Sequence, residues 1–313
     1  MISTWTPFME PPLEGVEFSG FSKYNTQLKI LRLDKMHPDF GGNKFFKLKR
    51  NIEKIKKLGS PPVLSFGGAY SNHLRALAAA GKMYSFKTLG LVRGEIVRPL
   101  NPVLKFCEAN GMELHALSRS AYRLKSTEKH LDLFRNKFGE FYLLPEGGSN
   151  REALIGCAEI PQFIPQTDEG SLRHIILACG TGLTLSGIAI GSSSLKSTKI
   201  IGFSTLKAPG YLAQQITKYL HSFANSFARK NLAPWRVEDN FHCGGYAKTD
   251  AGLLEFIKKF NKETMVPIEP VYTGKMLYGF SQLLGSGVIP PGGEVIAIHT
   301  GGIHNKMSSS QRV

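Results

Sequence analysis

Residues 178–184, with the sequence Ala-Cys-Gly-Thr-Gly-Leu-Thr, can bind a phosphate group. They follow the apolar run 174–178, which is typical of a buried strand, and they precede a helical pattern over 185–191. Main-chain N–H groups and the dipole at a helix start favour a dianion, and the hydroxyls of Thr181 and Thr184 add two donors. A plain strand-to-helix turn is the alternative, and we favour phosphate binding.

Nucleotide-binding loops do not explain this segment. A GxGxxG fingerprint that starts at Gly180 would need glycine at position 185, where Leu185 stands. The next predicted strand ends without the acidic residue that holds a ribose, and the sequence contains no Walker-type GxxxxGK motif followed by Ser or Thr. A phosphate loop without these signatures indicates a phosphorylated ligand that is smaller than a nucleotide.

Lys44 follows Gly41-Gly42-Asn43 and stands where a lysine could form an imine. Apolar residues recur after it at helical spacing and predict one buried helix face, which consists of Phe45, Leu48, Ile52 and Ile55. In the first turn of that helix the macrodipole disfavours an ammonium ion, and two phenylalanines adjoin it, so the pKa of Lys44 could be lowered. A nucleophilic amine needs such a pKa. From position alone, a solvated lysine is the simpler interpretation.

A polar turn, Ser71-Asn72-His73, follows the strand predicted over residues 62–66 and the pair Gly67-Gly68. Ser71 or Asn72 can cap the helix that the apolar pattern predicts after this turn. The N–H groups of such a helix start and three polar side chains can bind a carboxylate. An ordinary helix cap with exposed polar residues is equally compatible with the sequence.

Short apolar strands alternate with helical segments along the chain, and this βαβ rhythm predicts parallel sheets covered by helices. Strands are predicted at residues 62–66, 87–92, 113–117, 141–144, 174–178, 199–203 and 294–298. Helices are predicted after Lys44 and Asn72, and at 103–109, 127–138, 185–191, 212–223 and 249–261, the last capped by Thr249 or Asp250. No Pro/Gly/Ser-rich linker divides the chain, so two domains would be interwoven.

The composition is that of a globular protein, with 42% hydrophobic and 20% charged residues among 313. No apolar run approaches the roughly 20 residues that span a bilayer, and the first residues lack the features of a signal peptide. The four cysteines, Cys107, Cys157, Cys179 and Cys243, form no CxxC pair. We therefore expect reduced thiols in a cytoplasmic protein, without a metal site and without a membrane partner.

The sequence is strongly basic: 39 Lys and Arg residues against 24 Asp and Glu give a net charge of +15. Part of the excess lies between Phe40 and Ser60, where Glu53 is the only acidic residue. The basic residues of this stretch are Lys44, Lys47, Lys49, Arg50, Lys54, Lys56 and Lys57. Such an excess favours contact with anions. We favour a solvated basic surface over a nucleic-acid site. A non-catalytic protein that binds nucleic acid or another anion is the alternative from a different class.

These segments, in their order along the chain, resemble the 1-aminocyclopropane-1-carboxylate deaminase and D-cysteine desulfhydrase family. The resemblance spans residues 25–304 and rests on Gly41-Gly42-Asn43-Lys44, Lys47-Leu48, Gly67-Gly68, Ser71-Asn72-His73, Gly180-Thr181-Gly182, Pro270-Val271-Tyr272-Thr273-Gly274-Lys275 and His299-Thr300-Gly301-Gly302. It implies the tryptophan synthase β-like fold of pyridoxal-phosphate fold type II, with two interwoven α/β domains that each contain a parallel sheet. The large domain would comprise residues 1–44 and 151–313, and the small domain residues 45–150. The family also implies a homodimer.

The resemblance further implies roles for individual residues around pyridoxal 5′-phosphate. Lys44 would hold the cofactor as a Schiff base and then transfer protons, and Asn72 would contact the 3-oxygen of the ring. The phosphate would lie on Cys179, Gly180, Thr181, Gly182, Leu183 and Thr184, and Thr300 would face the ring nitrogen. The substrate would meet Ser71, Asn72, His73, Tyr246 and Tyr272, of which Ser71 and the two tyrosines would also take part in catalysis.

The implied activity is that of a lyase or deaminase on a small amino acid. β-Elimination from D-cysteine would give pyruvate, ammonia and sulfide, whereas opening of the cyclopropane substrate would give 2-oxobutanoate and ammonia. By resemblance, cyclopropane deaminases have a glutamate beside the ring nitrogen at the position of Thr273, and they lack a threonine at that of Thr300. A carboxylate raises the pKa of the nitrogen and strengthens the electron sink, which ring opening needs most. The two threonines therefore favour β-elimination, with the cyclopropane deaminase as the alternative.

Overall fold

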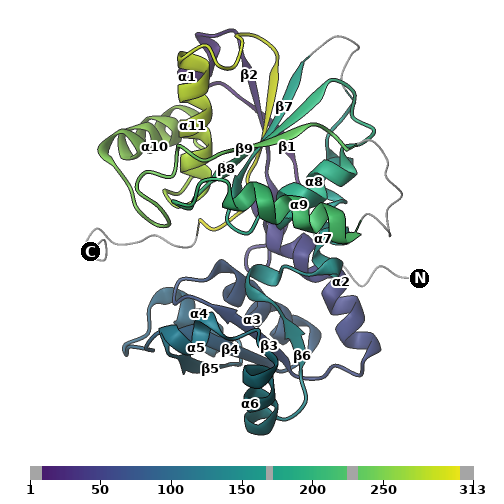
Figure 1. The fold of residues 1–313 in the computed structure, drawn as a ribbon. Coiled ribbons are helices and arrows are strands. Elements are labelled where there is room, and N and C mark those ends of the chain that lie inside the picture. The colour runs from purple at the N-terminus through teal and green to yellow at the C-terminus, as the bar shows by residue number, and fades with distance from the viewer. Residues whose placement is uncertain (1–8, 167–171, 224–231, 304–313) are drawn as a thin grey trace. The chain divides into compact units, whose positions relative to one another are not determined.

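The computed structural model describes residues 9–166, 172–223 and 232–303. The chain divides into two compact units, which Figure 1 shows together with their elements. The large unit comprises Met1–Pro38 and Leu154–Val313, and the small unit comprises Asp39–Ala153. The domain limits at residues 45 and 150, which follow from the resemblance, stay a prediction.

The large unit contains a six-stranded sheet in the order β1-β2-β10-β7-β8-β9. Its strands are β1 (Leu13–Val16), β2 (Gln27–Leu31), β7 (Arg173–Cys179), β8 (Thr198–Ser204), β9 (Trp235–Glu238) and β10 (Glu294–Ile298). Neighbouring strands are parallel except β1 and β2. Every residue of β7 is buried, as expected for a central strand with helices on both faces.

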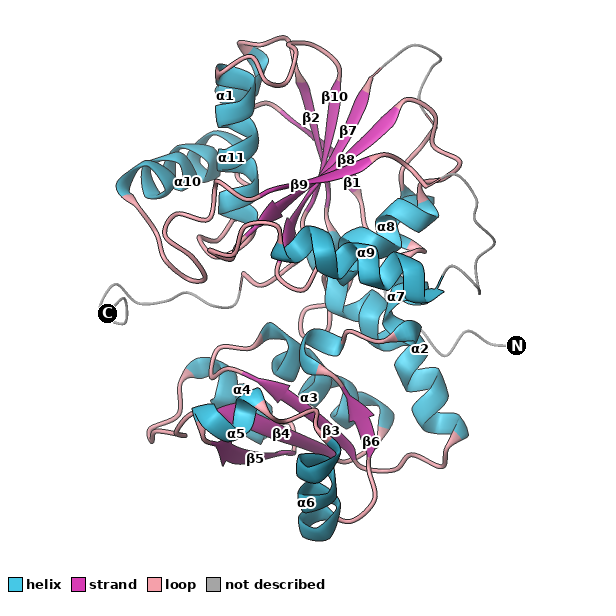
Figure 2. Cartoon of the chain, in the orientation of Figure 1, coloured by secondary structure: helices cyan, strands magenta, loops and turns pink. Residues whose placement is uncertain are grey.

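Helices cover both faces of this sheet, with α10 and α11 on one side and α8 and α9 on the other (Figures 1 and 2). The helices of the large unit are α1 (Ser19–Ser22), α8 (Leu183–Gly191), α9 (Tyr211–Phe223), α10 (Ala251–Thr264) and α11 (Thr273–Gly285), with short 3-10 turns at Leu33–Lys35 and Ile160–Phe163. Helix α7 (Arg151–Cys157) includes the sequence limit between the units. The N–H of Leu253 donates to Asp250 Oδ1 at 2.8 Å, so Asp250 is the predicted cap of α10.

The small unit contains a four-stranded parallel sheet in the order β5-β4-β3-β6. The strands are β3 (Val63–Gly67), β4 (Thr88–Arg93), β5 (Met112–Leu117) and β6 (Tyr142–Leu144). The helices are α2 (Asn43–Lys57), α3 (Asn72–Tyr84), α4 (Pro102–Ala109), α5 (Arg119–Arg123) and α6 (Glu128–Phe138), with a 3-10 turn at Glu146–Gly148. Phe66 of β3 packs against Tyr122 and Phe134 in the core.

The predicted fold class is confirmed, because both units combine parallel strands with covering helices. The sequence did not predict β1, β2, β9 or α11. Strands β1 and β9 have four residues each, which is too short for a clear alternation pattern. Helix α11 begins after Tyr272, a residue that is not a usual N-cap. Within the described part of the chain, no helix is long and apolar enough to cross a membrane.

Candidate active site

Lys44 is the second residue of α2, and its side chain is half-buried. Gly42 occupies the N-cap position with a φ of 73°, where an L side chain would be strained, and no side chain caps this helix start. Lys44 Nζ donates a hydrogen bond to Asn43 Oδ1 at 3.0 Å. The predicted apolar face of the helix is confirmed, since Phe45, Leu48, Ile52 and Ile55 are all buried. Core packing of α2 therefore holds Lys44 at the helix start.

Lys47 is not the solvated residue that the basic stretch suggested. Its side chain is buried, and its Nζ donates to the Gly147 carbonyl at 2.9 Å and to Ser149 Oγ at 3.4 Å. Both acceptors belong to the turn that follows β6. Lys47 therefore ties α2 to that turn within the small unit.

Ser71 is the N-cap of α3, which confirms the predicted cap. The N–H of Leu74 donates to Ser71 Oγ at 3.2 Å. Gly67 ends β3 directly beneath this cap, because a Cβ on Gly67 would lie 2.5 Å from Ser71 Oγ. Ser71 and Asn72 are both half-buried at the helix start. Their contacts with substrate and cofactor stay predictions.

The His73 side chain points into the small unit rather than away from it. It is buried, and its Nε2 lies 2.8 Å from Ser65 Oγ, whose own proton goes to the Leu144 carbonyl. Nε2 of His73 is therefore the donor, and Nδ1 carries a lone pair without a hydrogen-bond partner among the described residues. Burial, followed by the charges of Lys44 and Lys47, holds the pKa of His73 well below its usual value. A substrate contact at His73 would thus involve its main-chain N–H.

The predicted phosphate loop follows β7 and leads directly into α8. Gly182 is the helix N-cap with a left-handed φ of 81°, and a Cβ there would lie 2.8 Å from Ile216 Cγ1. Glycine is thus required at this position by both backbone and space. Helix α8 has no side-chain cap and no acidic residue in its first turn. Its N-terminus therefore carries no negative charge of its own.

Two tyrosines lie beside this loop in the large unit. A Cβ on Gly180 would be 3.5 Å from Tyr272 Cε1, so the Tyr272 ring lies over the loop. The Tyr272 hydroxyl donates to the Tyr246 hydroxyl at 3.3 Å, and the two rings pack edge to face. The structure thus brings Gly180, Tyr246 and Tyr272 together, as expected for one site.

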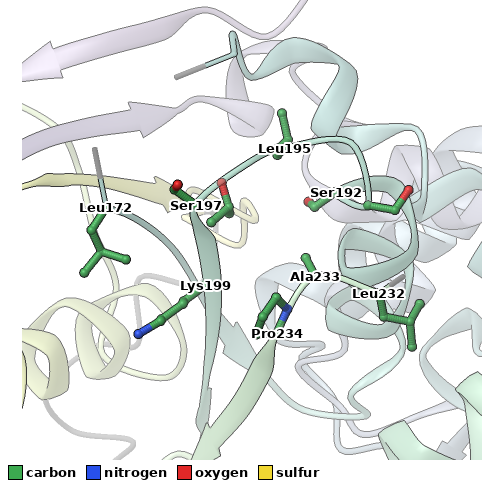
Figure 3. A pocket seen from close by; sticks show the side chains of 10 residues that line it. Leu172, Ser192, Leu195, Ser197, Lys199, Leu232, Ala233 and Pro234 are labelled. Carbon is green, nitrogen blue, oxygen red and sulfur yellow. The ribbon is translucent and has the colours of Figure 1, made fainter. Parts of the chain in front are cut away.

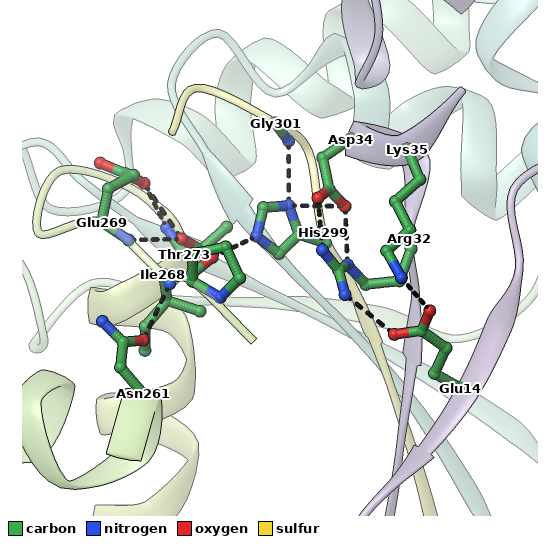
Figure 4. A network of polar contacts seen from close by, with 11 residues as sticks. Glu14, Arg32, Asp34, Lys35, Asn261, Ile268, Glu269, Thr273, His299 and Gly301 are labelled. Atoms are coloured by element: carbon green, nitrogen blue, oxygen red, sulfur yellow. Dashed lines mark hydrogen bonds and ion pairs between the residues drawn. The ribbon is translucent and has the colours of Figure 1, made fainter. Parts of the chain in front are cut away.

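The side chain of Glu269 caps the N-terminus of α11. Its buried carboxylate accepts hydrogen bonds from the main-chain N–H groups of Val271, Tyr272 and Thr273 at 2.7–2.9 Å. Its Oε1 also accepts from Thr273 Oγ1 at 3.2 Å, as Figure 4 shows. Burial raises the pKa of Glu269, and these hydrogen bonds oppose the rise. The Thr273 hydroxyl, which is fully buried, is thereby engaged with Glu269.

Thr300 lies at the carboxyl end of β10, the strand next to β7. Its side chain is half-buried and forms no hydrogen bond with a described residue. The preceding His299 donates from Nε2 to the Pro267 carbonyl at 2.9 Å, and its Nδ1 accepts from the Gly301 N–H at 3.3 Å. These two contacts fix the turn that carries Thr300.

A buried charged network supports this turn (Figure 4). Asp34 Oδ1 lies 3.2 Å from His299 Nδ1, and Arg32 holds the Asp34 carboxylate through two hydrogen bonds of 2.7 and 2.9 Å. Arg32 also donates to Glu14 at 2.8 Å. Burial lowers the pKa of His299, whereas the Asp34 carboxylate acts in the opposite direction.

A pocket of about 440 Å³ lies elsewhere in the large unit (Figure 3). Its lining includes Leu172, Ser197 and Pro234, which lie at or just before the amino ends of β7, β8 and β9. The phosphate loop follows the opposite, carboxyl end of β7. This pocket therefore contains none of the predicted site residues.

Comparisons with known proteins agree with the α/β fold described above. Residues 11–301 match the family of pyridoxal-phosphate dependent enzymes. The mitochondrial bifunctional D-cysteine desulfhydrase/1-aminocyclopropane-1-carboxylate deaminase of Arabidopsis thaliana is 29% identical over 89% of this chain and 73% of that protein. A D-cysteine desulfhydrase of Serratia proteamaculans is 25% identical over 93% of this chain and 91% of that protein. The crystal structure of a homologue of 1-aminocyclopropane-1-carboxylate deaminase superposes with a TM-score of 0.83 at 23% identity, covering 95% of this chain and 90% of that one.

The fold and the family match together define an α/β enzyme. The chain belongs to the family of pyridoxal-phosphate dependent enzymes, and pyridoxal 5′-phosphate is its cofactor. Because the family match extends over nearly the whole chain, the alternative of a non-catalytic basic protein is not supported.

The residues in each unit fit this cofactor. In the large unit, the glycine-capped start of α8 offers N–H donors and two threonine hydroxyls without a competing acid. In the small unit, Lys44 supplies a half-buried amine at the start of α2. These are the groups that a phosphate and an aldehyde require.

Sequence reasoning missed three buried charged residues that support the site. Lys47, Glu269 and Lys275 are buried, although charged side chains are usually exposed. Lys275 donates from Nζ to the Gly245 carbonyl at 2.7 Å, next to Tyr246. A signal was present for Lys275, because it lies four residues after Val271 within an apolar helical pattern.

Proposed function

We propose that this protein catalyses β-elimination from a small β-substituted amino acid such as D-cysteine, releasing pyruvate, ammonia and sulfide. The proposal is carried by the two residues, Thr273 and Thr300, that the resemblance assigns to the ring nitrogen. Thr300 offers a hydroxyl there, and Thr273 stands where the resemblance assigns a glutamate to cyclopropane deaminases. The nearby carboxylate, Glu269, is directed into the N-terminus of α11. A neutral contact at the nitrogen favours a moderate electron sink.

Such a sink suits elimination of sulfide from a substrate that has an α-proton. When bound, pyridoxal 5′-phosphate accepts the electrons that the substrate Cα releases. The Lys44 amine removes the α-proton, and the start of α8 holds the phosphate. Sulfide is a good leaving group, so its departure does not require a strongly protonated ring.

Substrate recognition is assigned to both units. In the small unit, Ser71, Asn72 and the main-chain N–H of His73 bind the substrate carboxylate at the start of α3. In the large unit, the hydroxyls of Tyr246 and Tyr272 face the β-substituent. The hydrogen bond between these tyrosines supports a shared role.

Opening of the cyclopropane ring is the second candidate. The Arabidopsis relative is named for both activities, which favours retaining this candidate. This substrate has no α-hydrogen, so the reaction depends on C–C cleavage and on a strong electron sink. We expect it to be the weaker activity.

We also propose a homodimer located in the cytoplasm. The family resemblance supports the dimer. The four cysteines are free thiols, three of them buried, as is usual in a reducing compartment. Light scattering of the purified protein tests the dimer, and cell fractionation tests the location; a monomer or an organellar protein would contradict them.

The decisive assay for the function compares released 2-oxoacids. The purified holoenzyme is given D-cysteine, L-cysteine, D-serine, β-chloro-D-alanine or 1-aminocyclopropane-1-carboxylate, and pyruvate and 2-oxobutanoate are measured. We expect the highest kcat/KM for pyruvate from D-cysteine or β-chloro-D-alanine. A higher kcat/KM for 2-oxobutanoate from the cyclopropane substrate would contradict the proposal.

A further inference from the structure

The loop that carries Tyr246 has an unusual backbone. Cys243 and Ala247 adopt left-handed φ values of 52° and 58°, and Gly244 and Gly245 have φ values of 92° and 124°. Only glycine adopts such values without strain. A loop with two non-glycine residues in this region persists only where its surroundings hold it.

Lys275 is the buried side chain of α11 that holds this loop. The loop's other main-chain hydrogen bonds are local: the His242 Nδ1 accepts from the Gly244 N–H at 3.0 Å, and the Lys248 N–H also donates to the Gly245 carbonyl at 3.1 Å. Lys275 lies in the first turn of α11 with an exposed fraction of 0%, and its Nζ donates to the Gly245 carbonyl at 2.7 Å.

No ion pair of Lys275 occurs among the described residues. Burial lowers the pKa of Lys275, and the charges of Cys243, Glu269 and Asp250, in that order, oppose this shift. An ammonium ion is disfavoured both by burial and by the start of a helix. The hydrogen bond from Lys275 to the Gly245 carbonyl offsets these two unfavourable effects.

We propose that Lys275 is a positioning residue for the substrate pocket, which fixes the strained loop 243–247 and so pairs the Tyr246 hydroxyl with the Tyr272 hydroxyl. Helix α11 then controls both tyrosines. Tyr272 precedes its first residue and donates its N–H to Glu269, and Tyr246 depends on Lys275 through the neighbouring Gly245. Tyr246 itself is exposed, so without this contact its own packing would hold it poorly. The inference rests on the proposed function, in which the two tyrosines face the substrate.

The test combines Lys275→Met with Tyr246→Phe. Lys275→Met keeps the length and apolar character of the stem but removes the donor. We expect it to lower kcat/KM for the preferred amino acid at least tenfold, mainly through KM, while the pyridoxal phosphate content stays unchanged. Because Lys275 acts through Tyr246, the double variant should be no worse than Tyr246→Phe alone. Lys248→Met, which removes an exposed lysine of the same region, is the control and should change neither value.

A second measurement does not depend on catalysis. Cys243 lies in the strained loop and is the half-buried cysteine, whereas the other three are buried. The Lys275 charge lowers the pKa of the Cys243 thiol, so its loss alone would slow the reaction of Cys243 with a thiol reagent. If Lys275→Met releases the loop, Cys243 should instead react several-fold faster, with the other cysteines unchanged. If Lys275→Met does not fold, Lys275→Gln replaces it, because the shorter amide does not reach Gly245 but remains polar.

The outcomes separate the inference from the proposed function. Multiplicative losses in the double variant, or a Cys243 rate that falls as loss of the charge alone would make it, would overturn the role of Lys275 while leaving the enzyme's function intact. If Tyr246→Phe itself changes nothing, the tyrosines do not face the substrate, and both this inference and that part of the proposed function fail. Non-additive losses together with faster labelling of Cys243 would support the inference.

Discussion

Two helices of the large unit begin at the predicted site, and their N-termini are treated in opposite ways. Helix α8 begins at a bare glycine loop without a side-chain cap or an acidic residue. Helix α11 begins over the buried carboxylate of Glu269, which accepts three main-chain N–H groups. A helix start attracts an anion in either case. The protein supplies that anion itself at α11, whereas at α8 we propose that the phosphate of the cofactor supplies it.

The two helix starts therefore have different proposed roles: α8 binds the cofactor phosphate, and α11 positions the two tyrosines. At α8 the first turn contains no acidic residue and no side-chain cap, which favours the approach of a phosphate. The internal carboxylate at α11 fixes a helix that holds Tyr272 directly and Tyr246 through Lys275. A third helix start, that of α3 in the small unit, is capped by a neutral hydroxyl, Ser71. A neutral cap leaves the remaining N–H groups available for a substrate carboxylate.

The largest expected effect follows from giving α8 an internal acid. Thr181→Asp places a carboxylate on the phosphate loop, so we expect the Kd for pyridoxal 5′-phosphate to rise about 1,000-fold, equivalent to about 4 kcal/mol. The apoprotein should remain folded, because an acid at a helix start is favourable. Equilibrium dialysis measures the change, with Thr181→Asn as the uncharged control. A Kd within tenfold of the wild-type value would show that the phosphate lies elsewhere.

The second effect concerns the hydroxyl cap of α3. Ser71→Ala should lower kcat about 100-fold, or about 2.7 kcal/mol, while cofactor occupancy stays unchanged, because the hydroxyl is proposed to meet the substrate. Ser118→Ala is a matched control, since Ser118 caps α5 by the same 3.2 Å hydrogen bond from a main-chain N–H. Both variants should lose about 1 kcal/mol of stability. Equal losses of occupancy and activity in Ser71→Ala would reduce Ser71 to a structural cap.

The third effect follows from removing the charge at α11. Glu269→Gln keeps one carbonyl acceptor but leaves buried N–H groups poorly satisfied, so we expect the free energy of unfolding to fall by about 2 kcal/mol. Asp250→Asn is the comparison, because asparagine caps a helix as well as aspartate does and Asp250 is exposed. Urea unfolding of the apoproteins measures both. Similar small losses in the two variants would mean that Glu269 is an ordinary cap.

The smallest expected effect is a pH dependence of the folding stability that comes from His73 in the small unit. His73 in the small unit is buried with its pKa held well below 6.5, by burial first and then by Lys44 and Lys47. The folded state holds His73 in its neutral form, whereas the unfolded state takes up a proton below its pKa of about 6.5. The contribution of His73 to folding stability is therefore fully present above about pH 6.5 and falls as the pH drops below that value. From pH 6.5 to 5.5, His73→Gln should therefore lose about 1 kcal/mol less stability than the wild type. Urea unfolding at both pH values measures this difference, and equal losses in the two proteins would contradict it.

Much of the framework was predictable from local sequence. Capping by Ser71 and Asp250, the apolar face of α2 and the strand before the phosphate loop all follow from periodicity and cap chemistry, and the structure confirms each. The orientation of His73 was not predictable, because its partner Ser65 lies eight residues earlier on another element. The same holds for Lys47 and Lys275, whose acceptors are main-chain carbonyls about 100 and 30 residues away in sequence. Sequence patterns register side-chain type, whereas these contacts depend on tertiary structure.

The role of Lys44 is the central claim, and one measurement tests it most directly. The holoenzyme is reduced with borohydride, digested and mapped by mass spectrometry, so that the pyridoxyl group marks the lysine that held the cofactor. We predict one adduct per chain, on Lys44, because Lys47 is buried and bonded to Gly147 and Ser149. An adduct on Lys47, or none on Lys44, would contradict the account.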